Sequence, residues 1–271
     1  MIFVLDKGSM ARNMLQYGHV YAWGREHGRT TMSMRFAYKY PWFQICETPH
    51  HNFMTYLFAK YGAKLGLFPT IHFDQENADY SREEQLMLNS RMIVVTGWYA
   101  RWYDLFEKYK PEIRELFAFN QEILATSRLK IGEGSAVRVG VHVRRGDYKT
   151  FKDGRFYYDD AQYVGVLKQF KTLMPETKLN FFVCGNDPEL NRDYFRRELE
   201  DEMCKVDFPD GNPAEDMCLL SLCDWLIGAP STFSLVAAMY REVPLYWIED
   251  PKATLTKENF KSFNELFRHI Y

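Results

Sequence analysis

Apolar and polar positions alternate most regularly in the second half of the chain. The run from Val137 to Val143 places a valine at every second position, which is the period of a strand, and β-branched residues favour that conformation. Beyond it, short apolar runs alternate with stretches of helical periodicity, which predicts a parallel sheet covered by helices, a Rossmann-like domain. We expect strands at 137–143, 179–184, 224–228 and 243–248, and helices at about 159–173, 188–200, 214–222 and 232–241.

The first half of the chain opens with a βαβ pattern, which predicts a second parallel sheet. Residues 38–80 are rich in aromatic side chains and contain three prolines, so we expect irregular structure there. Strands are predicted at 2–5, 30–34 and 92–96, and helices at about 10–26 and 111–124.

The change of rhythm near residue 137 predicts two domains. The polar, glycine-bearing stretch from Thr126 to Gly134 is the candidate linker between them. We therefore expect an N-terminal α/β domain at 1–130 and a C-terminal Rossmann-like domain at 131–250. The remaining residues, 251–271, are expected to include a helix that packs back on the first domain.

Composition narrows the classes of function. The chain has 271 residues, of which 46% are hydrophobic, and this is enough for two modest domains. A net charge of −2 offers no basic field to nucleic acid, and no apolar run approaches the roughly 18 residues of a membrane-spanning helix. Five cysteines match no zinc spacing, and their odd number indicates reduced thiols and a cytoplasmic location. We expect a small-molecule partner, with peripheral membrane association left open.

Residues with anion-binding chemistry follow the first strand of the C-terminal domain. His142, Arg144, Arg145 and Asp147 crowd its carboxyl end, the edge at which open α/β sheets bind ligands. Guanidinium groups match phosphate oxygens bidentately, so the cluster indicates an anionic, nucleotide-like ligand. Paired arginines are often only a solvated surface, but a position directly after a buried strand favours binding.

Two further loops are expected at the same sheet edge. Asn186 and Asp187 follow the second strand, and Ser231 and Thr232 precede the last helix of the domain. Hydroxyl groups at a helix N-terminus bind anions, although capping of the helix would also explain them. Asp216 lies near the start of another helix, where it could accept hydrogen bonds from a purine or ribose or complement the helix dipole.

Five segments resemble, in chain order, the α-1,2-fucosyltransferase family of inverting glycosyltransferases, and HVRRGDY is the most specific of them. The resemblance covers most of the chain and implies an α/β, GT-B-type fold in which two Rossmann-like domains face a cleft. It also implies transfer of L-fucose from GDP-fucose to a galactose-type hydroxyl of a glycan, in α-1,2 linkage, with no metal or other cofactor. The segments are GSMARNMLQYG (8–18), TGWYARWYDLFEKYKPEIRELF (96–117), HVRRGDY (142–148), CGNDPEL (184–190) and EDMCLLSLCDWLIGAPSTFSLVAAMY (215–240).

The same resemblance assigns roles to the residues at the sheet edge. It implies that Arg144 contacts the donor pyrophosphate and stabilises the departing GDP, and that His142 and Asp216 hold guanine. Asp147 is the candidate base for the acceptor hydroxyl, and a purely structural pairing with Arg145 is the alternative. The implied donor-binding residues are His142, Arg144, Arg145, Asn186, Asp187 and Asp216, with Ser231 and Thr232 on the phosphate side.

One departure from the family pattern leaves other functions open. The family's N-terminal run resembles GGLGNQMFQYA, whereas this chain differs at Ser9, Ala11, Arg12 and Asn13. A catalytically silent nucleotide-sugar-binding module is therefore one alternative, and a fucosyltransferase-superfamily enzyme of different linkage is another. A phosphosulfate-dependent sulfotransferase is disfavoured because the phosphate loop expected after the first strand is missing.

Overall fold

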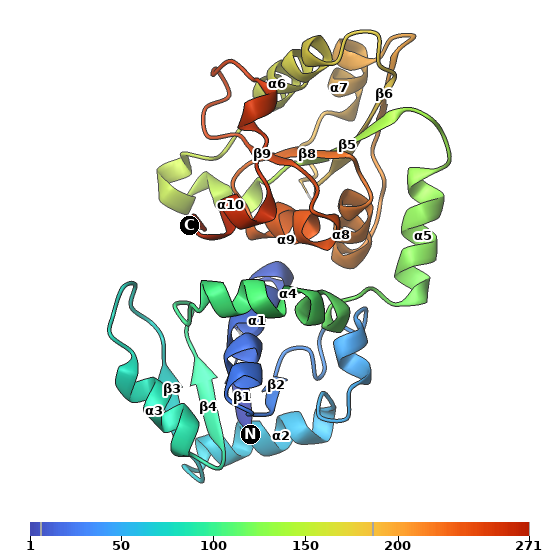
Figure 1. Ribbon diagram of the computed structural model, residues 1–271. Coiled ribbons are helices and arrows are strands. Elements are labelled where there is room, and N and C mark those ends of the chain that lie inside the picture. The colour runs from blue at the N-terminus through green and yellow to red at the C-terminus, as the bar shows by residue number, and fades with distance from the viewer. Residues whose placement is uncertain (6, 186, 271) are drawn as a thin grey trace. The chain divides into compact units, whose positions relative to one another are not determined.

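The computed structural model describes residues 1–5, 7–185 and 187–270, and the chain divides into two compact units (Figure 1). Unit 1 is Met1–Asn120 and unit 2 is Gln121–Tyr271. The division lies before the predicted boundary at 130 because helix α5, Gln121–Ile131, packs on helix α8, Pro213–Ser221, of unit 2. Much of the stretch at 126–134 is therefore helix and not a linker.

Unit 1 contains a four-stranded parallel sheet in the order β2-β1-β4-β3. The βαβ opening is confirmed, and Phe3 at the centre of the sheet pairs in register with Met32 on one side and Val94 on the other. Helix α1 packs against helix α4 (Figure 1). The strands are β1 (Ile2–Leu5), β2 (Thr31–Ser33), β3 (Thr70–His72) and β4 (Ile93–Thr96); the helices are α1 (Met10–Glu26), α2 (Phe53–Lys64), α3 (Ser81–Asn89) and α4 (Tyr103–Leu116).

Two expectations for unit 1 are corrected. Residues 38–80, expected to be irregular, contain the 3₁₀ turn η1 (Gln44–Glu47), helix α2 and strand β3. Pro111 was placed at the start of a helix, but it lies inside α4. A proline there removes one backbone hydrogen bond, and the helix continues because Phe106 and Ile113 are buried on either side of it.

Unit 2 contains a five-stranded parallel sheet in the order β7-β6-β5-β8-β9. Most predicted elements are confirmed; strand β7 (Cys204–Asp207) was missed because it is only four residues long and half exposed. The remaining strands are β5 (Val137–His142), β6 (Leu179–Cys184), β8 (Trp225–Gly228) and β9 (Leu245–Trp247), and the remaining helices are α6 (Asp160–Leu173), α7 (Arg192–Leu199) and α9 (Thr232–Arg241). Two short 3₁₀ turns, η2 (Gly146–Lys149) and η3 (Phe151–Gly154), follow β5.

The two faces of the central strand β5 have different neighbours, which explains why its sequence alternates. Val139, Val141 and Val143 are at most 1% exposed and belong to one hydrophobic core with residues of α6 and α7. On the opposite face, a Cβ atom at Gly140 would lie 2.7 Å from a methyl group of Leu220, so the glycine lets α8 approach the sheet.

The expectation of one helix in the C-terminal segment is also corrected. The single helix expected within 251–271 is two short elements, the 3₁₀ turn η4 (Lys257–Asn259) and helix α10 (Phe263–Phe267), because Ser262 caps a new helix between them. Helix α10 packs against α9, and Lys261 bridges to Leu245 of β9, so the segment belongs to unit 2. Its packing on the first domain stays a prediction. All five cysteines are free thiols, as expected. Within the described residues, no helix is long and apolar enough to cross a membrane.

Candidate functional site

Parallel pairing places the carboxyl ends of β5, β6 and β8 side by side. His142, the last residue of β5, is in register with Cys184 of β6 and with Gly228 of β8. The strands approach closely because a Cβ atom at Gly228 would lie 2.7 Å from the His142 carbonyl oxygen. The sheet edge predicted from the sequence therefore exists, and it brings the three loops together. Of the predicted site residues, Asn186 lies outside the described residues.

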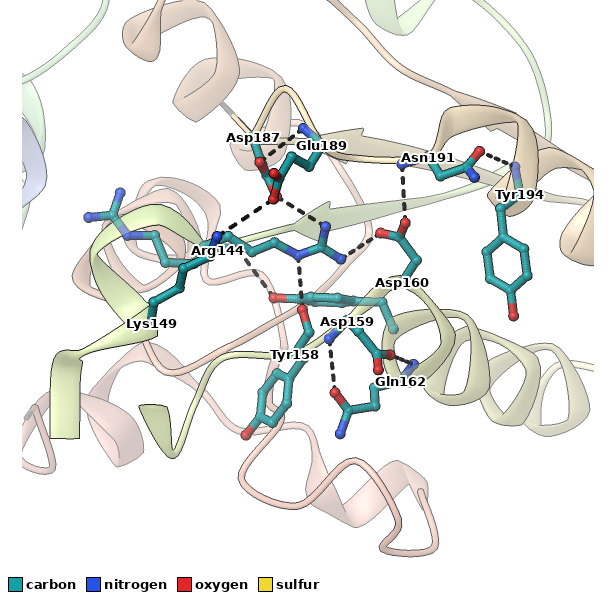
Figure 2. A network of polar contacts seen from close by, with 12 residues as sticks. Arg144, Lys149, Tyr158, Asp159, Asp160, Gln162, Asp187, Glu189, Asn191 and Tyr194 are labelled. Atoms are coloured by element: carbon teal, nitrogen blue, oxygen red, sulfur yellow. Dashed lines mark hydrogen bonds and ion pairs between the residues drawn. The ribbon is translucent and has the colours of Figure 1, made fainter. Parts of the chain in front are cut away.

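Arg145 is the centre of a buried polar network at this edge, and Figure 2 labels its partners Tyr158, Asp160 and Asp187. Its side chain is 5% exposed, and its Nε donates to the Tyr158 carbonyl oxygen at 2.9 Å. Nη2 contacts Asp160 Oδ1 at 2.5 Å, and Nη1 contacts Asp187 Oδ2 at 3.1 Å. All three guanidinium nitrogens are thus engaged, so Arg145 and Asp187 hold three loop segments together.

The carboxylates of this network fix the neighbouring backbone. Asp187 Oδ1 accepts from the Glu189 backbone N–H at 3.0 Å, and Asp160 Oδ2 accepts from that of Asn191 at 3.2 Å (Figure 2). Asp159 caps α6 in a capping box with Gln162, as its predicted place at a helix start requires. The expected pairing of Arg145 with Asp147 is wrong, because Arg145 points into the protein and finds Asp160 and Asp187 there.

Arg144 has the opposite environment. Its Nη2 contacts Asp147 Oδ1 at 2.8 Å, and its side chain is 28% exposed. Its Nε is buried without a hydrogen-bond partner among the described residues. A buried N–H of a cation without an acceptor is costly, and an anionic ligand would satisfy it. The ion pair expected for Asp147 therefore forms with Arg144.

His142, two residues before this arginine, is a buried, neutral imidazole. Burial, and then the charge of Arg144, lowers its pKa to about 3. The ring stacks on Phe233 with centroids 4.8 Å apart, and within the described part of the chain its buried Nδ1 has no partner. His142 can therefore offer a ligand a hydrogen bond but no charge.

The N-terminus of α9 completes the cluster. Ser231 is the N-cap, and its hydroxyl accepts from the Phe233 backbone N–H at 3.2 Å; Thr232 is the first helical residue. The Tyr148 hydroxyl donates to the Pro230 carbonyl oxygen at 2.5 Å and so ties the loop after β5 to the loop after β8. The predicted helix N-terminus is confirmed, and Tyr148 is a supporting residue that the sequence reasoning missed.

Asp216 lies on the first turn of α8, behind the N-cap Asn212. Burial, together with Glu215 and Asp210, raises the pKa of its carboxyl group to about 7, although Lys130 acts in the opposite direction. The Asp216 carboxylate in turn contributes to a raised pKa of the Cys184 thiol at the end of β6, and α8 packs against β5 and β6. Among the described residues, no group of side chains forms a candidate metal site.

Comparison with known proteins assigns the chain to a family. The family model "Glycosyl transferase family 11" matches residues 76–243. The chain belongs to glycosyl transferase family 11. The family resemblance predicted from the sequence is thereby confirmed, and the matched range contains every predicted donor-site residue while excluding the altered run at 8–18.

Over the matched residues, three relatives are about a quarter identical to this chain. Alpha-1,2-colitosyltransferase of Escherichia coli is 27% identical over 199 residues, which are 70% of this chain and 65% of that protein. Galactoside alpha-(1,2)-fucosyltransferase 2 of Mus musculus is 24% identical over 88% of this chain and 67% of its own length. Galactoside alpha-(1,2)-fucosyltransferase 1 of Plecturocebus brunneus is 27% identical, and the match spans 46% of its length.

Solved structures share the fold. A mutant of Arabidopsis thaliana FUT1 in complex with GDP superposes with a TM-score of 0.65 at 15% identity, over 96% of this chain and 73% of that one. POFUT1 in complex with GDP-fucose gives 0.57 at 13% identity over 89% and 93%, and NodZ alpha-1,6-fucosyltransferase gives 0.57 at 12% identity over 96% and 98%. The α/β, GT-B-type fold with two Rossmann-like domains is confirmed; the cleft between them stays a prediction.

Proposed function

We propose that this family 11 protein is an inverting glycosyltransferase that transfers L-fucose from GDP-fucose to a galactose-type hydroxyl of a glycan, in α-1,2 linkage. The observation that carries the proposal is Arg144 Nε, which is buried at the carboxyl edge of the sheet with no partner among the described residues. The Arg144 guanidinium lies over the Tyr148 ring, whose hydroxyl donates to the Pro230 carbonyl oxygen just before α9. The names of the family 11 relatives supply the sugar and the linkage.

Arg144 would contribute most of the electrostatic stabilisation of the departing GDP. Negative charge develops on GDP as the glycosidic bond breaks, and a fixed guanidinium stabilises that charge more in the transition state than before it. Backbone N–H groups at the N-terminus of α9, with the hydroxyls of Ser231 and Thr232, add positive potential on the phosphate side. These groups can neutralise the pyrophosphate with protein atoms alone, so the proposal includes no metal or other cofactor.

Asp147 has two chemically distinct roles open to it. Its side chain is 65% exposed, which would let an acceptor hydroxyl reach it as the base of an inverting displacement. Its ion pair with Arg144 instead suits a positioning role, in which the carboxylate fixes the guanidinium toward the pyrophosphate. The base assignment stays a prediction, and the two roles differ in their pH dependence.

His142 and Asp216 would hold the guanine base. The Watson–Crick edge of guanine presents two N–H donors, and a carboxylate can accept from both. Asp216 can accept both hydrogen bonds only when it is ionised. Burial favours its protonated form, so donor binding would require Asp216 to lose its proton. Neutral His142 would add a hydrogen bond through its unpartnered Nδ1.

The proposed partners are a GDP-sugar donor and a glycan acceptor, with peripheral association to a membrane. We place the reaction in the cytoplasm, because five free thiols suit a reducing compartment. A second donor sugar has specific support, since one family 11 relative is a colitosyltransferase.

A donor panel tests the proposal. Turnover of GDP-fucose, its colitosyl counterpart and a UDP-sugar would be measured with a galactose-terminated acceptor array, and products would be analysed for linkage. We expect transfer from GDP-fucose in α-1,2 linkage and none from the UDP-sugar. If the colitosyl donor were preferred, the transferred sugar would be wrong, but the rest of the proposed function would stand. Tight GDP binding by calorimetry without transfer to any acceptor would establish the silent-module alternative that the altered run at 8–18 motivates.

A further inference from the structure

Helix α2 of unit 1 turns one row of large apolar residues toward solvent. Met54 is 73% exposed, Phe58 is 49% exposed and Tyr61 is 52% exposed, and Leu65 directly after the helix is 72% exposed. The fully buried residues of the same helix are the small ones, Ala59 and Gly62. This arrangement reverses the usual one, in which a surface helix buries its large apolar side chains.

The exposed residues form one face. Positions 54, 58, 61 and 65 follow each other at spacings of four, three and four, which aligns their side chains along a single stripe of a helix. The helix cannot roll to bury this stripe, because Gly62 is pressed against Phe68: a Cβ atom there would lie 2.4 Å from the Phe68 ring. Close packing of the small face therefore fixes the apolar stripe outward.

Positive charge flanks the stripe. The only charged residues of α2 are Lys60 and Lys64, and both are exposed. The turn after the helix adds Leu67, which is 68% exposed. A helix that combines an outward apolar stripe with lysines and has no carboxylate matches the chemistry of an anionic lipid surface, in which acyl chains take the apolar residues and phosphates attract the lysines.

We propose that α2 and the turn to Leu67 are a membrane-docking surface that binds anionic phospholipid. A second copy of the chain is the less favoured occupant, because α2 offers no carboxylate to the lysines of an identical helix. The proposal gives the peripheral membrane association of the proposed function a specific surface. Membrane docking by α2 does not depend on which sugar is transferred, so an experiment can contradict the docking proposal without contradicting the proposed transfer, and the reverse.

Vesicle co-sedimentation of the full chain tests the surface. Phosphatidylcholine vesicles would be compared with vesicles of phosphatidylcholine and phosphatidylglycerol in equal parts. We expect partition onto the anionic vesicles only. The double variant Met54→Gln and Leu65→Gln should lower the partition coefficient at least tenfold, because both lost side chains are apolar and outward. Lys60→Gln and Lys64→Gln should each lower it about fivefold.

Leu129→Gln is the matched control, since Leu129 is 83% exposed on helix α5 of unit 2. It should bind vesicles as the unchanged protein does, and every variant should keep the thermal midpoint and the transfer rate to a soluble acceptor. Equal binding to both vesicle types, or undiminished binding by the Met54→Gln and Leu65→Gln protein, would overturn the proposal. So would a dimer in analytical ultracentrifugation that this double variant dissociates, because the stripe would then belong to a second copy.

Discussion

Arg144 and Arg145 are consecutive in the chain, yet their guanidinium groups lie in opposite environments. Arg145 is 5% exposed and bonded through all three nitrogens, whereas Arg144 is 28% exposed and keeps a buried Nε without a partner among the described residues. One arginine therefore supports the sheet edge, and the other is available to a ligand. The difference separates their expected mutant phenotypes.

Arg144→Ala should reduce turnover and leave stability unchanged. Loss of one preorganised donor to a developing anion typically costs about a hundredfold or more in kcat. We expect that loss in steady-state transfer from GDP-fucose, with a thermal midpoint close to that of the unchanged protein. Arg197→Ala is the control, because Arg197 is a solvent-exposed arginine of α7. Undiminished kcat in the Arg144→Ala protein would remove this residue from the site.

Asp147→Asn should distinguish the base from the positioning role. The amide cannot accept a proton but can still accept a hydrogen bond from Arg144. If Asp147 only positions the guanidinium, kcat should fall by less than about tenfold and its pH profile should keep its shape. A base role predicts a fall in kcat of about a hundredfold or more, together with a changed pH profile. The measurement is kcat and KM over pH 5 to 9.

Arg145→Met should destabilise unit 2. The substitution leaves the carboxylates of Asp160 and Asp187 without their cation, and breaking a buried ion pair in this way costs about 3–5 kcal/mol. Urea denaturation should show the loss. Arg192→Met removes the exposed pair with Asp210, whose 2.8 Å distance lies between those of the two Arg145 pairs, and should cost less than about 1 kcal/mol. Equal costs for the two variants would contradict the structural role of Arg145.

Donor affinity should depend on pH through Asp216. Its pKa is about 7 in the free protein, and guanine binding needs the carboxylate, so affinity should fall about tenfold per pH unit below 7 and level off above it. Calorimetric titration with GDP-fucose is the suitable measurement, because its diphosphate is esterified at both ends and has no secondary phosphate ionisation in this range. Asp216→Asn should bind weakly at every pH; retention of the slope would assign it to another group.

The same carboxyl group should affect stability. Its pKa is raised from 3.8 in the unfolded chain to about 7 in the folded one, so its contribution is fully present below pH 3.8 and is lost as pH rises through 7. The unfolding free energy of the unchanged protein, minus that of Asp216→Asn, should therefore decrease over this window. His142 titrates in both proteins and cancels in the difference. A flat difference would contradict the raised pKa.

Gly228→Ala should strain the sheet edge. The added methyl group would meet the His142 carbonyl oxygen at 2.7 Å, and separating β5 from β8 to make room should cost about 1–3 kcal/mol. Gly165→Ala, in α6, is the control because no atom lies within 4 Å of the added Cβ atom. That control should be stabilised by up to about 1 kcal/mol, since alanine is the better helix former. Thermal or urea unfolding of both variants checks the contrast.

Much of unit 2 could be predicted because its strands are buried in a parallel sheet. Such strands have apolar, β-branched runs that a local pattern reveals, and parallel pairing then brings their loops to one edge. The partners of Arg145 could not be predicted in this way. Asp160 and Asp187 lie 15 and 42 residues further along the chain, and nothing local distinguishes them from Asp147.

Helix α2 was missed for the opposite reason. Periodicity methods assume that large apolar side chains mark the buried face, but in α2 the buried face consists of Ala59 and Gly62. Its aromatic residues, together with the prolines nearby, resemble an irregular stretch. The short strand β7 gives little signal as well, since two of its four residues are exposed.

The attachment of α5 has a consequence for exchanging parts between family 11 members. Ser127 Oγ donates to the Glu215 carbonyl oxygen at 3.2 Å, and Lys130 forms an ion pair with the Glu215 carboxylate. A chimera joined at residue 130 would take α5 from one parent and α8 from the other, and these contacts would be mismatched. Joining at Asn120 keeps both helices from one parent, so N-terminal units could be swapped without disturbing the helix that carries Asp216.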